Sequence, residues 1–111
     1  MNVEEIRAYS LSKEGAEEGF PFGEETLVFK VNGKIFLLVG LGEVPVQFNV
    51  KCDPERAIEL REEYDCIQPG YHMNKKHWNT IIIDQTLSAK QLKEHIDHSY
   101  ELVCKSKKKK G

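Results

Sequence analysis

The feature that most constrains this chain is an Asn32-Gly33 pair that lies between two apolar segments. Apolar residues recur at every second position of the segment 26–31, which predicts a strand with one buried face. Asn and Gly both accept positive φ angles, so the pair predicts a tight two-residue turn between antiparallel strands. The segment 34–41 is then the returning strand, and the chain must contain an antiparallel hairpin.

More strands are predicted after this hairpin. Apolar and polar residues alternate over 44–51, which predicts a strand with one wet face. Pro45 favours either an edge strand or a place among the first residues of the strand. The segments 67–73 and 78–84 are predicted to be extended, the second because it is rich in β-branched residues. The segment 15–23 is predicted to be a loop, because glycine and proline interrupt it.

Three helices are predicted from their N-terminal capping patterns. Asn2 with Glu5, and Ser88 with Gln91, have the three-residue spacing of a capping box. Asp53 is followed by a proline, which favours the first position of a helix. The resulting order is α-β-β-β-α-β-β-α, with helices segregated from antiparallel strands. We therefore expect an α+β fold whose helices pack on one face of the sheet.

The composition is that of one globular domain. The chain has 111 residues, of which 40% are hydrophobic and 31% are charged. The densest apolar stretch, 35–41, is too short to cross a membrane, and residues 1–5 lack the apolar run of a signal peptide. The three cysteines form no CxxC pair, so reduced thiols are expected. We expect a cytoplasmic monomer with a single domain over residues 1–104.

Charge is distributed unevenly along the chain. Residues 1–65 carry 14 acidic and 7 basic side chains, whereas residues 66–111 carry 4 acidic and 9 basic ones. Five of these lysines lie in the C-terminal tail, 105–111. A polyanion cannot be gripped over the whole surface of so acidic a body, so any such site must be local. The tail itself is read either as a nucleic-acid arm or as a solubilising end.

The sequence offers no pattern typical of catalysis. It contains no recognisable nucleophile turn and no glycine-rich phosphate loop. His95 and His98 are three residues apart on the last predicted helix, but no CxxC or HExxH pattern accompanies them, so we expect exposed helix residues and no metal site. We predict neither an enzyme nor a bound cofactor.

The most informative segment is 69–80, whose sequence is PGYHMNKKHWNT. It places Lys75, Lys76 and a histidine on a turn between two strands, with Tyr71 and Trp78 on either side. Lysines on a turn can reach phosphates, and neighbouring rings or amides can contact a sugar or a base. The same segment can equally be a solvated turn, with Trp78 in the core.

Segment 69–80 is also where the chain resembles a known family. Together with Pro21-Phe22-Gly23, the strand 26–31, Gly33-Lys34 and Ser99-Tyr100, it resembles the MmcQ/YjbR family over residues 3–104. The resemblance implies a bacterial protein with a CyaY-like α+β fold. It also implies DNA binding through a "double wing" arrangement, without an enzymatic activity.

The resemblance supplies the candidate site. The matching positions are Lys34, His72, Asn74, Lys75, Lys76, His77, Trp78 and Asn79. We expect Lys75 and Lys76 to contact phosphate, with Lys34 adding to them. We expect the two histidines and Asn79 to shape the turn or to donate hydrogen bonds, and Trp78 to hold its strand against the core.

Two other functions stay open at this point. The first is a protein-interaction or regulatory module that binds no nucleic acid, because an exposed edge strand at 44–51 would be a template for another chain. The second is metal handling, by analogy with frataxin, through Glu4, Glu5, Glu17 and Glu18. The expected partner is thus DNA or another protein, and no membrane contact is expected.

Overall fold

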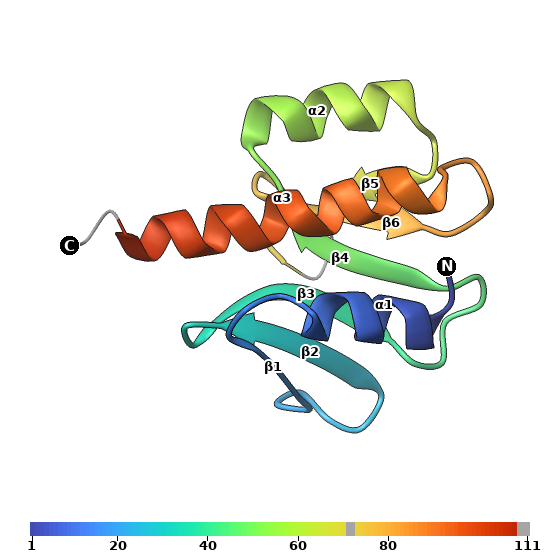
Figure 1. Cartoon of the computed structure of the whole chain (residues 1–111). Coiled ribbons are helices and arrows are strands. Elements are labelled where there is room, and N and C mark those ends of the chain that lie inside the picture. Colours follow the sequence, from blue (N-terminus) through green and yellow to red (C-terminus); the bar gives the residue numbers. More distant parts are fainter. Residues whose placement is uncertain (71–72, 109–111) are drawn as a thin grey trace.

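The protein folds into a six-stranded antiparallel sheet and three helices (Figure 1). The computed structural model describes residues 1–70 and 73–108. The strand order in the sheet is β1-β2-β3-β4-β6-β5. The elements are α1 (Val3–Leu11), β1 (Ala16–Gly19), β2 (Thr26–Val31), β3 (Lys34–Gly40), β4 (Gln47–Lys51), α2 (Pro54–Glu63), β5 (Ile67–Pro69), β6 (Trp78–Ile82) and α3 (Ala89–Lys108). The predicted α+β class is confirmed.

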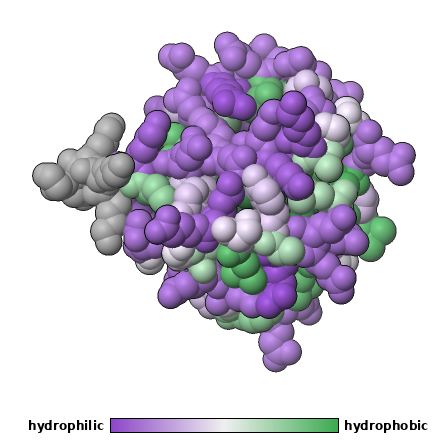
Figure 2. Space-filling view, in the orientation of Figure 1, coloured by the Kyte–Doolittle hydropathy of each residue, from purple (hydrophilic) through white to green (hydrophobic). Residues whose placement is uncertain are grey.

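The main core lies between one face of the sheet and the helices. Helices α1 and α3 lie over the sheet, and α2 packs beside β5 (Figure 1). The sheet contributes alternate residues of each strand, such as Phe29 of β2 and Phe48 of β4, and α3 contributes Leu92 and Ile96. The outer surface of this helical side is mostly hydrophilic (Figure 2). One side of the sheet is therefore sealed by helices, and its other side is left for other contacts.

The predicted turn and capping chemistry is present. Asn32 and Gly33 have φ angles of 55° and 78°, so both occupy the positive-φ region that the tight turn requires. Asn2 accepts from the backbone N–H of Glu5 at 2.8 Å, and the Glu5 side chain accepts from Asn2 in return at 2.9 Å. Ser88 and Gln91 make the same reciprocal pair at the start of α3.

The expected element order is wrong by one strand. Residues 16–19, predicted to be loop, form β1 and pair with β2. Their AEEG sequence does not signal a strand, because the two glutamates are poor strand formers. Pairing with β2 stabilises the extended conformation of this segment. Glu18 also pairs with Arg7 of α1, whose Nη2 atom lies 2.6 Å from the Glu18 carboxylate. A tertiary contact thus overrides the local propensity.

The strand at 44–51 is also corrected. β4 begins at Gln47 and is central, because it pairs with β3 on one side and β6 on the other. Pro45 lies outside the strand, so its missing N–H removes no hydrogen bond from the sheet. Of the two alternatives for Pro45, the edge position is wrong, and the proline lies just before the first residues of the strand.

The predicted ends of several elements shift. β5 ends at Pro69, and β6 ends at Ile82. Helix α3 continues to Lys108, so residues 105–108 are helical where a frayed tail was expected.

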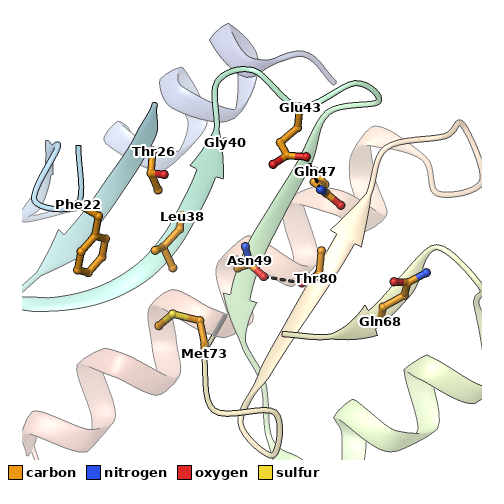
Figure 3. Close-up of a pocket in the computed structure, with 10 residues that line it drawn as sticks. All are labelled: Phe22, Thr26, Leu38, Gly40, Glu43, Gln47, Asn49, Gln68, Met73 and Thr80. Atoms are coloured by element: carbon orange, nitrogen blue, oxygen red, sulfur yellow. Dashed lines mark hydrogen bonds between the residues drawn. The ribbon is translucent and has the colours of Figure 1, made fainter. Parts of the chain in front are cut away.

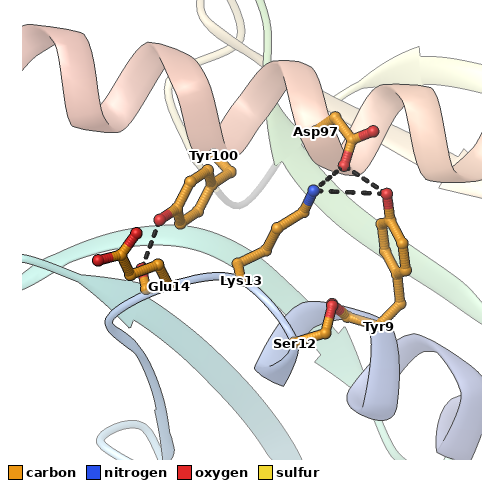
Figure 4. A network of polar contacts seen from close by, with 6 residues as sticks. All are labelled: Tyr9, Ser12, Lys13, Glu14, Asp97 and Tyr100. Atoms are coloured by element: carbon orange, nitrogen blue, oxygen red, sulfur yellow. Dashed lines mark hydrogen bonds and ion pairs between the residues drawn. The ribbon is translucent and has the colours of Figure 1, made fainter.

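A polar network fastens α1 to α3 (Figure 4). The Tyr9 hydroxyl donates to Asp97 at 2.6 Å, and the Lys13 ammonium pairs with the same carboxylate. Lys13 also lies 4.8 Å from the centre of the Tyr9 ring, a cation–π distance. The Tyr100 hydroxyl donates to the Glu14 carbonyl. These contacts fix α1 at the end of the sheet where β1 begins.

A second junction joins α3 to the centre of the sheet. β3 carries one extra residue, Phe36, at a register shift opposite β2, and the Phe36 ring packs edge-on against Tyr100 with the centres 5.4 Å apart. The buried Ser99 hydroxyl donates to the Phe36 carbonyl at 2.5 Å and accepts from the Lys51 N–H at 2.9 Å. One side chain thus satisfies a backbone group on each of two strands.

Ser99→Ala should therefore destabilise the fold. It leaves the buried Phe36 carbonyl and the partly buried Lys51 N–H unpaired, so we expect a loss of about 2 kcal/mol in the free energy of unfolding. Urea denaturation measures it. Ser10→Ala is the matched control, because the Ser10 hydroxyl is buried and has no hydrogen-bond partner among the described residues. Equal losses in the two variants would contradict the assigned role of Ser99.

Candidate functional site

The antiparallel topology brings four lysines to one end of the sheet. β3 begins at Lys34, β4 ends at Lys51, and β6 begins after the connection that carries Lys75 and Lys76. Neighbouring strands are about 4.8 Å apart, so β3 and β6 are separated by roughly 10 Å at this end. We call these four lysines the basic end. One acidic side chain, Asp53, lies two residues after Lys51 at the start of α2.

The turn before β6 is shaped by Asn74. Its Oδ1 atom accepts from the Lys76 N–H at 2.9 Å, and its carbonyl accepts from the N–H groups of His77 and Trp78. A side-chain oxygen that caps the backbone two residues on is typical of an Asx turn. Lys75 and Lys76 are exposed at its tip. Asn74 thus orders the turn on which the two exposed lysines lie.

Arg61 of α2 holds this turn from behind. Its Nε atom donates to Asn79 Oδ1 at 2.7 Å, and its Nη2 atom donates to the carbonyls of Lys75 and Trp78. This residue was not among those predicted from the sequence. Its signal was its position four residues after Ala57, which places a cation on the inward stripe of the helix.

The other predicted site residues lie in different environments. Asn79 is buried at 1% exposure and faces Arg61, so it supports the turn and does not reach the surface. His77 is half-buried, and its carbonyl accepts from Cys52. Lys34 is exposed at the start of β3. His72, like Tyr71, lies outside the described residues.

Trp78 packs on the face of the sheet opposite the helices. It is 8% exposed and forms a small second cluster with Val28 and Leu38. The backbone passes close by, because a Cβ atom at Gly70 would lie 2.9 Å from Trp78 Cβ. Only glycine fits at position 70 without a shift. The tryptophan is thus a packing residue, as expected, but outside the main core.

The YjbR family model matches residues 11–102 of the chain. The chain belongs to the YjbR family. It is 44% identical over 85 residues to the uncharacterized protein YbdF of Escherichia coli O157:H7, covering 76% of this chain and 69% of YbdF. It is 31% identical over 101 residues to the uncharacterized protein YjbR of Escherichia coli K12, covering 91% and 86%. The resemblance found in the sequence is confirmed.

The fold of this chain is similar to that of solved structures of other proteins. The crystal structure of the Deinococcus radiodurans protein DR2400, with its DUF419 domain, superposes with a TM-score of 0.87 at 40% identity, covering 92% of this chain and 78% of that one. A Pseudomonas syringae protein superposes with a TM-score of 0.79 at 27% identity, covering 93% and 99%. In this YjbR chain, no helix of the described residues is long and apolar enough to cross a membrane.

The two histidines of α3 are buried more deeply than expected. His95 is 8% exposed, and burial, with the positive charge of Arg56, lowers its pKa to about 4. Burial also lowers the pKa of His98, whose Nε2 atom accepts from the Asp53 N–H at 3.3 Å. The start of α2 packs against this side of α3, which a helical pattern alone does not reveal. The described residues contain no group of three or more His, Cys, Asp or Glu side chains that could hold a metal ion.

Arg61→Ala should loosen the turn at 74–77, which precedes β6. The substitution removes the hydrogen bonds to Asn79, Lys75 and Trp78, so we expect amide hydrogen exchange at Trp78 to accelerate at least several-fold, since a lost charged hydrogen bond costs about 2 kcal/mol. Arg56→Ala is the control, because Arg56 is exposed on the same helix. Unchanged exchange in Arg61→Ala would contradict the support role.

Acid should destabilise the protein through His95. Below about pH 6.5 the unfolded chain binds a proton on this imidazole, whereas the folded chain does so only near pH 4. The free energy of unfolding therefore falls between these pH values, by roughly 3 kcal/mol from His95. Urea denaturation of wild type and His95→Gln from pH 7 to 4 measures it. Parallel pH profiles for the two proteins would rule out this contribution.

Proposed function

We propose that this YjbR-family protein binds nucleic acid by holding phosphates at its basic end. The observation that carries the proposal is the meeting of Lys34, Lys51, Lys75 and Lys76 at one end of an otherwise acidic fold. Lysine ammonium groups neutralise phosphates and release condensed counterions, which supplies much of the affinity of such complexes. The acidic surface of the rest of the protein repels the phosphate backbone of the nucleic acid, which confines the contact to the basic end.

Two exposed turns give the proposed contact its shape. The turn at 32–33 joins β2 to β3, and the turn at 74–77 precedes β6, on the same end of the sheet. Such a pair of projecting turns suits the "double wing" arrangement described for the family. The CyaY-like topology, the lack of an enzymatic activity and a cytoplasmic, monomeric state belong to the same proposal.

A protein-interaction module is the second candidate. The edge strand on which this function was first based is in fact the central strand β4. Another observation favours a protein-interaction module. Phe20, Phe22, Leu41 and Val44 are large apolar residues exposed by 42–94%. They lie in the β1–β2 and β3–β4 loops, at the end of the sheet opposite the basic end. Exposed apolar residues that gather in neighbouring loops are typical of a contact surface.

Lys75→Ala/Lys76→Ala should weaken nucleic-acid binding. Fluorescence anisotropy with labelled duplex and single-stranded DNA over a salt series measures it. Each lost phosphate contact lowers the magnitude of the log–log salt slope on duplex DNA by about 0.9, so the pair should lower it by up to about 2. Lys90→Ala/Lys93→Ala, two exposed lysines in the first turns of α3, should leave the slope unchanged.

A tail variant separates the folded domain from the lysine-rich end. Lys107, Lys108, Lys109 and Lys110 are replaced by serine together. Binding that survives this change but falls with the turn variant supports the basic end. Binding lost with the tail alone would assign the affinity to a non-specific arm. No binding by any variant would reject the nucleic-acid proposal and favour the apolar loops as a protein contact.

A further inference from the structure

The face of the sheet opposite the helices carries a pocket of about 590 Å³ (Figure 3). Its floor is formed by alternate residues of adjacent strands, among them Leu38 of β3, Asn49 of β4 and Thr80 of β6. Phe22 from the β1–β2 loop and Met73 from the turn before β6 form apolar walls. A pocket of this size falls in the range that holds small organic ligands.

The floor presents an ordered hydrogen-bond donor. The Thr80 hydroxyl donates to Asn49 Oδ1 at 2.5 Å, and Figure 3 shows the two side chains side by side. This bond fixes the amide, and Asn49 Nδ2 makes no hydrogen bond with another described residue. An amide with one atom held and one atom available is pre-oriented for a ligand.

Other amides add acceptors and donors. The Gln68 side chain of β5 is exposed and makes no hydrogen bond with another described residue, so both of its polar atoms are available. Gln47 Nε2 donates to Glu43 at 2.7 Å, which leaves Gln47 Oε1 as an acceptor. Among the described residues that line the pocket none is a lysine or an arginine, and only Glu43 carries a charge. The site therefore suits an uncharged group with donors and acceptors on its edge.

The apolar walls add a preference for a flat ring. Phe22 is 63% exposed, so one side of its ring is available for stacking, and the Leu38 and Met73 side chains lie on the same face of the sheet. Base–aromatic stacking together with amide hydrogen bonds is how proteins recognise unstacked nucleobases. A nucleobase meets both demands, since it is planar and carries donors and acceptors on one edge.

The pocket also lies beside the basic end. Asn49 and Lys51 are two residues apart on the same face of β4, which separates them by about 7 Å along the strand. A nucleotide with its base at Asn49 would therefore direct its phosphate towards Lys51. The cation and the amide lie in the order that a base and its phosphate require.

We propose that this pocket holds one unstacked nucleobase of a single-stranded nucleic acid, whose phosphates lie along the basic end. The proposal rests on the proposed function and sharpens it. In a duplex, the edges and faces of the bases are occupied by pairing and stacking, so a base reaches such a pocket only from a single strand or after flipping. The protein should thus prefer single strands.

Two oligonucleotides of equal length test the proposal by fluorescence anisotropy. One carries thymines, and the other has abasic sites throughout, so that both present the same phosphates. Wild type should bind the thymine strand roughly tenfold more tightly, because stacking of one base contributes about 1–3 kcal/mol. Gln68→Ala and Phe22→Ala, both exposed residues, should remove this difference. The exposed Gln85, changed to Ala, should keep it.

A second measurement does not involve phosphate. Uncharged nucleosides are titrated into the labelled protein, and NMR follows the side-chain amide signals of Asn49 and Gln68. Shifts of these signals, with the abasic discrimination, support the pocket. No shifts and equal affinity for both strands would overturn it while leaving phosphate binding at the basic end intact. Nucleoside shifts without salt-dependent oligonucleotide binding would keep the base pocket and reject the proposed function.

Discussion

Pairing on both sides of β4 is the constraint on which the rest of the molecule depends. The strand joins the meander β1–β3 to the later pair β5 and β6, which are distant in sequence. Its register sets which residues share a face, because a slip of one residue would turn every side chain over. Phe48 and Val50 then face the helices, while Asn49 and Lys51 face the open side. Both the basic end and the pocket exist only in this register.

The contacts that hold this register come from the helices. The Ser99 hydroxyl of α3 accepts from the last N–H of β4 and donates to the Phe36 carbonyl of β3. These two hydrogen bonds fix the position of β4 relative to β3 along the strand direction. Arg61 of α2 does the same for the turn that leads into β6. Buried hydrogen bonds of this kind contribute modestly when made and cost more when broken, so they favour one arrangement over its neighbours. The helices on one face thereby position groups that act on the other.

Local patterns predicted the parts of the fold that depend on local chemistry. The turn at 32–33, the capping boxes and the alternation of β2 follow from φ preferences, caps and periodicity, and each is confirmed. β1 was missed because its glutamates disfavour a strand. Its extended conformation is stabilised by pairing with β2 and by the ion pair between Arg7 and Glu18. β4 was misplaced because Pro45 was taken as part of the strand.

In the candidate site too, local sequence predicted some residues correctly, whereas others depend on tertiary packing. Lys75, Lys76 and Asn74 lie on an exposed turn, as the polar run at 74–77 predicted. Asn79 and His95 could not be placed, because their burial depends on which helix packs against them. The open-face pocket is built from one or two residues of each of five strands and from three of the loops between them, so no short segment of sequence carries its pattern. Only the strand order brings its amides together.

The separate packing of Trp78 has an optical consequence. It is the chain's only tryptophan, and it contacts Leu38 and Met73, which also line the pocket. Excitation at the red edge of the protein absorption band therefore produces fluorescence from Trp78 on the open side of the sheet, and the helix-covered core contributes none. The protein carries an intrinsic fluorophore placed beside the surface where a partner would arrive, and no dye has to be attached to observe it.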